Sequence, residues 1–331
     1  PLSDRLFNRR FFSPKGSVKR VTDTTGKKPL AAGAIAARFP YGPRRLLSLV
    51  ALVMVIAAYW LPLDMAVSLN AVAASAGHAA FTVLGVIGAI FANSTGAGGG
   101  VVFLPAFAEL GFTESQAVST SFGIQCFGMT AGALAWSHFY QQQHRDSAQW
   151  KPFLPAVLLC SALSATGLWL VYALDLPAPA SVGPMFATFS LFLGAAILLT
   201  VSLNRHTGSR DQLEAVDLIA LSLIAVGGGM VTAWLSVGVG EFIAFYLILR
   251  RYNATLSVAV AVVVSALTVW CAAPQHLYLG DQAVWPVIAF AGPGAVIGGL
   301  IARHLVLKLG AQRLKLFFGG WLLLIGLSEF I

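Results

Sequence analysis

Long runs of apolar residues, separated by short polar or basic stretches, make up most of the chain after residue 45. Most runs are close to the ~20 residues that a helix needs to cross a bilayer. They lack the strict alternation of apolar and polar residues that is typical of a membrane barrel. The pattern therefore predicts an all-α polytopic membrane protein. The expected uninterrupted spans are 46–63, 115–139, 152–174, 182–203, 256–273, 284–302 and 314–330.

Two further apolar blocks are interrupted by glycine. Block 79–111 contains NSTGAGGG, and block 215–250 contains VGGGM and SVGVGE. Glycine releases the backbone from regular helix, and unpaired backbone groups inside a membrane have to be buried in protein or line a wet cavity. We therefore expect each block to form a hairpin of two helices.

The distribution of basic residues orients these segments, because Lys and Arg are enriched in cytoplasmic loops. With all basic clusters inside, the first hairpin opens to the outside and the second to the cytoplasm, and three spans follow each. The basic clusters lie at 44–45, 145–151, 205–210, 250–251 and 303–315, whereas the connections 64–78, 174–182 and 274–283 contain no Lys or Arg.

A sequence repeat divides the chain in the same way. A shift of 142 residues aligns 94–121 with 236–263 and gives eight identities in 28 positions. The sequence thus predicts two inverted repeats, each a glycine-broken helical hairpin plus three transmembrane helices, with one extra N-terminal transmembrane helix. The expected parts are a basic, poorly ordered cytoplasmic segment (1–43), the extra helix and its connection (44–78), repeat 1 (79–204) and repeat 2 (205–331).

Composition and charge agree with this picture. Only 10% of residues are charged, against about 25% in soluble domains. The net charge of +8 lies in residues 1–45, which alone carry +9. We interpret this tail as a segment that contacts anionic lipid rather than nucleic acid, in a bacterial inner-membrane protein with a cytoplasmic N terminus. The three cysteines have no pair spacing, so neither a metal site nor a cofactor is expected.

Inverted repeats with broken helices are typical of transporters. A helix that begins inside the membrane presents unpaired N–H groups and the positive end of its dipole, and both favour an anion. We therefore predict that a small anion binds near the midplane, between the two hairpins. The candidate substrate-binding residues are Asn93, Ser94, Thr95, Gly96, Gly98, Gly99, Gly100, Ser121, Gln125, Trp234, Ser236, Gly238 and Gly240.

Glu241 is a charged residue deep in an apolar block, directly after the second glycine turn. Carboxylates inside a membrane are costly and are functional candidates by default. Glu241 is therefore a candidate for proton coupling, beside a bound anion. A structural role, as a helix cap or as the partner of a basic or hydroxyl group, is an equally good interpretation.

A glycine run that ends in proline, GAGGGVVFLP, lies at 96–105 and is followed by AVSTS at 117–121, and SVGVGE at 236–241 is a weaker second copy of the glycine run. These segments resemble the motifs of the sulfite exporter TauE/SafE (TSUP) family. Two positions depart from the pattern, since Glu241 replaces a glycine and Leu247 stands where Pro105 has its counterpart. Over 79–331 the resemblance implies passive or ion-coupled movement of small anions such as sulfite, thiosulfate, sulfonates or organic acids.

Two other functions share some of these features. An anion channel would have the same architecture. An intramembrane enzyme would need a nucleophile and a base within reach of each other, but the chain has neither G-x-S-x-G nor H-E-x-x-H and no mid-span histidine. We therefore expect a secondary transporter or facilitator and not an enzyme. Its expected partners are a small anion and membrane lipid, and a homo-oligomer is compatible with the sequence.

Overall fold

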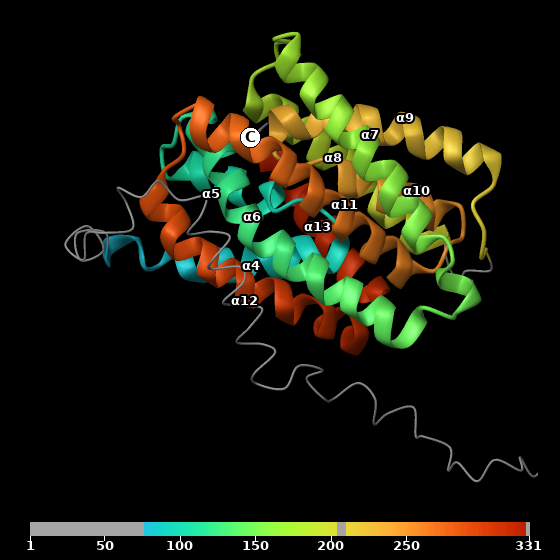
Figure 1. The fold of residues 1–331 in the computed structure, drawn as a ribbon. Helices are drawn as coiled ribbons and strands as arrows, with labels where there is room; N and C mark the ends of the chain where they lie inside the picture. Colours follow the sequence, from blue (N-terminus) through green and yellow to red (C-terminus); the bar gives the residue numbers. More distant parts are fainter. Residues whose placement is uncertain (1–75, 204–209, 329–331) are drawn as a thin grey trace, which may run out of the picture. The chain divides into compact units, whose positions relative to one another are not determined.

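The computed structural model describes residues 76–203 and 210–328, and every regular element within these ranges is helical. The expected N-terminal segment 1–43 and extra span 46–63 lie outside the described residues. The long helices are α4 (Phe81–Thr95), α5 (Gly100–Glu109), α6 (Glu114–Phe139), α7 (Phe153–Ala173), α8 (Val182–Leu203), α9 (Ala215–Leu235), α10 (Val239–Leu249), α11 (Ala254–Pro274), α12 (Trp285–Leu309) and α13 (Ala311–Ser328), as Figure 1 shows. Short helical segments are η1 (Ala76–His78), η2 (Tyr140–His144), η3 (Ala148–Trp150) and η4 (Gln275–Leu279).

Five helical segments among the described residues are long and apolar enough to cross a membrane. Their length and composition support the expected membrane architecture. The segments are Ala148–Ala173, Val182–Leu199, Ala215–Leu235, Ala254–Leu279 and Trp285–Leu309.

Helix α6 is not one of these five, although a span was expected at 115–139. It has 26 residues, but Ser119, Thr120, Ser121 and Gln125 lower its hydropathy. These four side chains are at most 4% exposed. Their polar groups therefore face protein rather than lipid, and α6 lies inside the helix bundle.

The helices pack in reciprocal pairs across the two halves. Helix α4 lies along α12, α7 lies along α9, and α6 and α8 pack against α11 and α13 respectively. Glycine permits the close approach, because a Cβ atom at Gly85 would overlap the carbonyl oxygen of Ala291, and one at Gly229 would overlap that of Ser164. Small residues at helix contacts are the usual means of bringing membrane helices together.

The prediction that VGGGM interrupts the second apolar block is wrong. Helix α9 runs without a break from Ala215 to Leu235, and only the later SVG stretch ends it. Gly229 faces the backbone of α7, and a Cβ atom at Gly228 would lie 2.8 Å from the Cα atom of Val239. These glycines therefore serve helix packing within α9 rather than a turn.

The helix ends in the two glycine-broken blocks are spaced by 140 residues, and not by the 142 of the ungapped alignment. This spacing separates the C-caps of α4 and α9, at Gly96 and Ser236, and the N-caps of α6 and α11, at Thr113 and Asn253. A shift of two residues rotates a helix by about 200°. The residues that are identical at a shift of 142 therefore do not occupy equivalent positions.

A hydrogen-bonded cluster around Asp217 joins the start of α9 to the end of α10. The fully buried Asp217 carboxylate accepts hydrogen bonds from Arg250 Nε at 2.6 Å, the Tyr246 hydroxyl at 2.8 Å and the Tyr252 hydroxyl at 2.6 Å. Glu214 pairs with Arg250 at 2.9 Å and is itself largely exposed. We call these five residues the Asp217 cluster.

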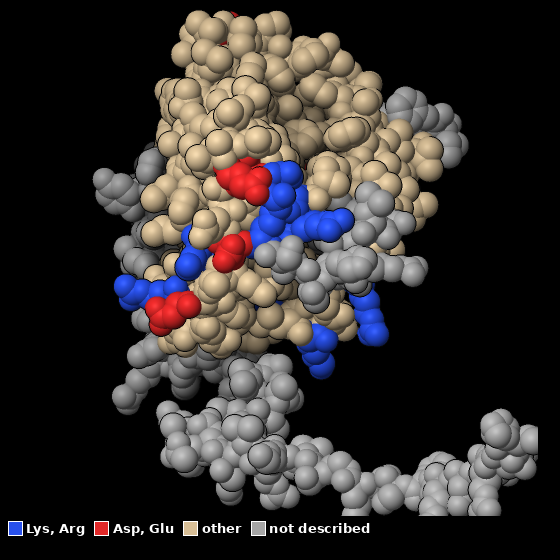
Figure 2. Space-filling model, turned by 90° about the vertical axis from the view of Figure 1, so that its right-hand side faces the viewer, with Lys and Arg blue, Asp and Glu red and all other residues tan. Residues whose placement is uncertain are grey.

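On the face in Figure 2, acidic and basic side chains lie side by side, next to a broad surface without charges.

Candidate functional site between two glycine turns

Both interrupted blocks form two helices joined by a sharp turn, as their glycines predict. The first turn comprises residues 96–99, between α4 and α5, and the second comprises 236–238, between α9 and α10. Each begins with a left-handed residue, Gly96 at φ 84° and Ser236 at φ 57°. Glycine adopts this conformation without cost, which explains how α4 can end there.

The two turns touch each other, and glycine makes the contact possible. A Cβ atom at Gly98 would lie 3.0 Å from the carbonyl oxygen of Ser236, and one at Gly100 would lie 2.9 Å from it. A Cβ atom at Gly240 would overlap the carbonyl oxygen of Gly96. The N-terminal ends of α5 and α10 are thereby brought together.

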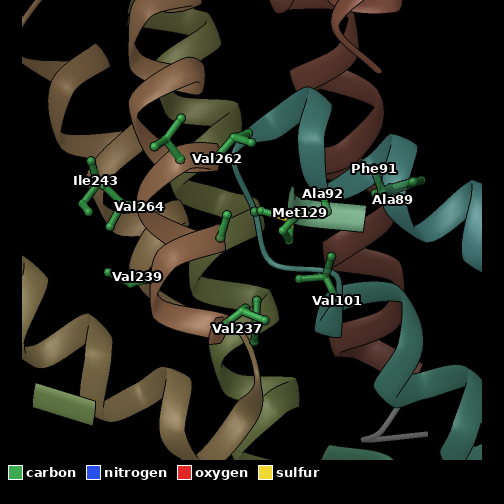
Figure 3. Close-up of a cluster of buried hydrophobic side chains, with 14 of the residues drawn as sticks. Ala89, Phe91, Ala92, Val101, Met129, Val237, Val239, Ile243, Val262 and Val264 are labelled. Atoms are coloured by element: carbon green, nitrogen blue, oxygen red, sulfur yellow. The ribbon is translucent and has the colours of Figure 1, made fainter. Parts of the chain in front are cut away.

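Apolar side chains surround this contact and keep it dry. Val101, Val237 and Val239 are each 1% exposed, and Figure 3 shows them with Met129 and Ile243 in the buried cluster around the turns. Hydrogen bonds are stronger in such surroundings than in water, and a polar group without a partner is costly there.

Glu241 connects the two turns directly. One carboxylate oxygen accepts the N–H of Gly98 at 2.8 Å, and the other accepts the N–H of Gly238 at 2.9 Å. Glu241 is the third residue of α10 and is 4% exposed. A single side chain therefore holds N–H groups from both halves of the chain.

Gln125 on α6 makes a second connection. Its Oε1 atom accepts the N–H of Gly99 at 2.8 Å, while its Nε2 atom donates to the carbonyl and hydroxyl oxygens of Ser236 at 3.0 and 2.7 Å. Nε2 also lies 3.0 Å from the Ser121 hydroxyl, to which Ser236 donates at 3.1 Å. Ser121, Gln125 and Ser236, which are three of the predicted substrate-binding residues, thus form one buried network.

Two threonine hydroxyls accept backbone N–H groups at the turns. The Thr95 hydroxyl accepts the N–H of Ala97 at 3.1 Å, and the Thr232 hydroxyl accepts the N–H of Val239 at 3.1 Å. Sequence reasoning missed Thr232. It lies four residues before Ser236, so the turn that follows it in the sequence could have indicated its capping role.

Three predicted residues lie outside this network. Asn93 donates to the carbonyl oxygens of Ala89 and Gly128, at the contact of α4 with α6. The buried Ser94 hydroxyl has no partner among the described residues. Trp234 donates to the carbonyl oxygen of Leu176 and lines a neighbouring cavity.

That cavity has a volume of about 370 Å³. Its lining includes Ser119 of α6 and Trp234 of α9, each two residues before a member of the network. His276 also lines it, between the Ser119 hydroxyl at 3.3 Å and the Tyr172 hydroxyl at 2.8 Å. The cavity therefore has polar groups in its wall, while the residues of the turn network are not part of its lining.

A sequence model of the sulfite exporter TauE/SafE family matches residues 80–328. The chain belongs to this family. The matched region contains both turns, α6 and Glu241, and the resemblance found in the sequence is confirmed. Searches of curated proteins and of solved structures gave no match.

Membership of the TauE/SafE family makes this an integral membrane transport protein, in agreement with its apolar helices. The family is one of transporters, which is consistent with the expectation that the protein is not an enzyme. Within the described residues, no group of three or more His, Cys, Asp or Glu side chains could hold a metal ion. The polar groups at the two turns are backbone N–H donors, hydroxyls, one amide and one carboxylate.

Sequence reasoning also missed the Asp217 cluster, and it favoured a structural role for Ser265, on the span after the second turn. Ser265 on α11 is 4% exposed, and its hydroxyl lies where a Cβ atom at Gly240 would be. It lies 140 residues after Gln125, which is the spacing of the helix ends and not the 142-residue spacing of the sequence identities.

Proposed function

We propose that this TauE/SafE protein moves a small anion across the membrane, by binding it between the two turns. The class is sulfite, thiosulfate, a sulfonate or a related organic anion. The observation that carries the proposal is the convergence of three backbone N–H groups, from Gly98, Gly99 and Gly238, on side-chain oxygens in a buried, apolar place. Such N–H groups at helix N-termini suit an anion.

We further propose that the two halves are inverted repeats. The packing supports this, because α4 contacts α12 as its counterpart α9 contacts α7, while the counterparts α6 and α11, and α8 and α13, pair with each other. A pseudo-two-fold axis exchanges helices in this manner. The basic residues at both ends of block 215–250 support opposite orientations of the hairpins and a cytoplasmic N terminus.

Each part of the site has a role in this proposal. Gly98, Gly99 and Gly238 donate to the anion, and Ser121, Gln125 and Ser236 orient it. Glu241 links its binding to a proton. The remaining predicted residues shape or cap the turns and line the path to them: Asn93, Ser94, Thr95, Gly96, Gly100, Trp234 and Gly240. With the cell interior negative, export of a monovalent anion is favoured by about 2.3 kcal/mol per 100 mV, so export requires no pump.

Anion flux in proteoliposomes tests the proposal. We expect the purified full-length protein to release entrapped sulfite, thiosulfate or a sulfonate faster than protein-free vesicles, with a rate that saturates at high substrate concentration. The absence of flux for all of these anions and for short carboxylates would contradict it. A rate that rises linearly without saturation would indicate a channel instead.

Replacing Gln125 by leucine is expected to weaken substrate binding. Leucine removes the Nε2 donor that orients the anion and that holds the Ser236 carbonyl, and a hydrogen bond to a charged group contributes roughly 1.5–3 kcal/mol. The anion concentration for half-maximal flux should therefore rise by at least about tenfold. The same change at the exposed Gln142, on η2, is the control and should leave this concentration unchanged. If both variants had the same anion concentration for half-maximal flux, Gln125 would not be part of the binding site.

A further inference from the structure

Glu241 makes one hydrogen bond more than a helix cap requires. A glutamate at the third position of a helix commonly accepts the N–H of its own N-cap residue. The 2.9 Å bond from Gly238 is such a cap. The 2.8 Å bond from Gly98 is different, because Gly98 lies 143 residues away and belongs to the other turn. Capping of α10 therefore does not account for where the second carboxylate oxygen lies.

The side-chain oxygens at the turns reproduce the acceptor pattern of a small oxyanion. Glu241 supplies two oxygens and Gln125 supplies one, and each accepts a backbone N–H at 2.8 or 2.9 Å. A sulfite ion or a sulfonate group likewise presents three oxygens. Two of the three donors that an anion would use are thus already bound to a carboxylate of the protein.

Ser265 gives an independent indication that the site takes a ligand. Its buried hydroxyl has no hydrogen-bond partner among the described residues. The hydroxyl points at the first turn of α10, since a Cβ atom at Gly240 would overlap it. A buried hydroxyl without a partner is unfavourable by roughly 1–3 kcal/mol. A ligand at the N-terminal end of α10 would provide the missing partner.

We propose that the Glu241 carboxylate is a tethered anion, which occupies the site in the absence of substrate and which the transported anion has to displace from Gly98. This inference rests on the proposed function. Two anions cannot share the same buried N–H donors, because like charges at hydrogen-bonding distance repel strongly. Substrate binding is therefore a competition against a carboxylate that the chain itself holds at high effective concentration.

The experiment compares wild-type protein with Glu241→Ala, using formate as the probe. Formate carries the carboxylate that alanine lacks and is small enough to take its place. We expect formate to raise the unfolding midpoint of the purified full-length alanine variant but not that of the wild type. The sulfite concentration that gives half of the maximal rise in the unfolding midpoint should be at least about tenfold lower for the variant, because the tethered competitor is gone. Asp175→Asn, which neutralises an exposed carboxylate after α7, should behave as the wild type.

Two outcomes would overturn the inference: an alanine variant that formate does not stabilise, or a wild type that formate stabilises equally. Should Glu241→Ala not fold, Glu241→Gln decides in the same assay. Glutamine accepts only one of the two N–H groups, so a formate response larger than that of the wild type is expected, and an equal response overturns the idea. The change of the unfolding midpoint with formate is measured without any transport. A protein without anion flux would therefore contradict the proposed function, while the formate experiment would still test the tethered carboxylate.

Discussion

Replacing Gly240 by alanine is expected to destabilise the protein by roughly 1–3 kcal/mol, because the new methyl group overpacks a filled site. It would overlap the carbonyl oxygen of Gly96 and the hydroxyl of Ser265. The two turns have to separate to admit it, and the Gly98–Glu241 hydrogen bond between them then lengthens. Anion flux should fall by at least about tenfold, since the Gly98 and Gly238 N–H groups move apart and can no longer both donate to one anion, and a hydrogen bond to a charged group contributes roughly 1.5–3 kcal/mol.

Gly227→Ala is the matched control for this prediction. Gly227 lies inside α9, and a Cβ atom there would meet nothing within 4 Å. Alanine favours helix over glycine by up to about 1 kcal/mol, so the control should be as stable as the wild type or more stable. Thermal unfolding in detergent and flux in proteoliposomes measure both variants. A Gly240→Ala protein that matches the control in stability and flux would show that the close contact of the turns is dispensable.

Replacing Asp217 by alanine is expected to destabilise the protein by roughly 2–4 kcal/mol, because it removes the buried acceptor of an ionic network. Arg250, Tyr246 and Tyr252 each lose a hydrogen bond of 2.6–2.8 Å. These bonds join the two ends of the second hairpin, so the variant should unfold at lower temperature and give less folded protein. Transport per folded molecule should change much less, since the Asp217 cluster lies at the far ends of α9 and α10 from the turn.

Glu214→Gln is the control, since Glu214 pairs with the same Arg250 in an exposed position. Its side chain is 57% exposed, whereas that of Asp217 is fully buried. Solvent screens an exposed ion pair, which therefore stabilises a protein little, so this variant should unfold close to the wild-type temperature. If the two variants unfolded alike, burial of the Asp217 carboxylate would not be what stabilises the hairpin.

Features that depend on neighbouring residues could be predicted well from the sequence. The stretches NSTGAGGG and SVGVGE predict interruptions of the apolar runs, and the turns at 96–99 and 236–238 lie within them. The same reasoning failed at Gly228 and Gly229, which lie inside α9. A glycine permits either a turn or a close helix contact, and only the packing partner distinguishes the two.

The candidate site could likewise be predicted only in part, since the sequence indicates its polar residues but not their partners. Gln125, Ser236 and Glu241 were predicted because polar side chains in apolar segments need partners. Their partners were not predicted, since Gln125 and Ser236 lie 111 residues apart, and Glu241 and Gly98 lie 143 apart. The Asp217 carboxylate was overlooked for a related reason, because its donors come from the other end of the hairpin.

By itself, the sequence determined that this is a helical membrane protein of the TauE/SafE family with two glycine turns and a carboxylate beside the second. These properties follow from hydropathy and local backbone preference, which act over a few residues. Only the tertiary structure decided that the turns touch and that Glu241 holds an N–H group from each. Such hydrogen bonds depend on the positions of atoms brought together by helix packing, to within a fraction of an ångström.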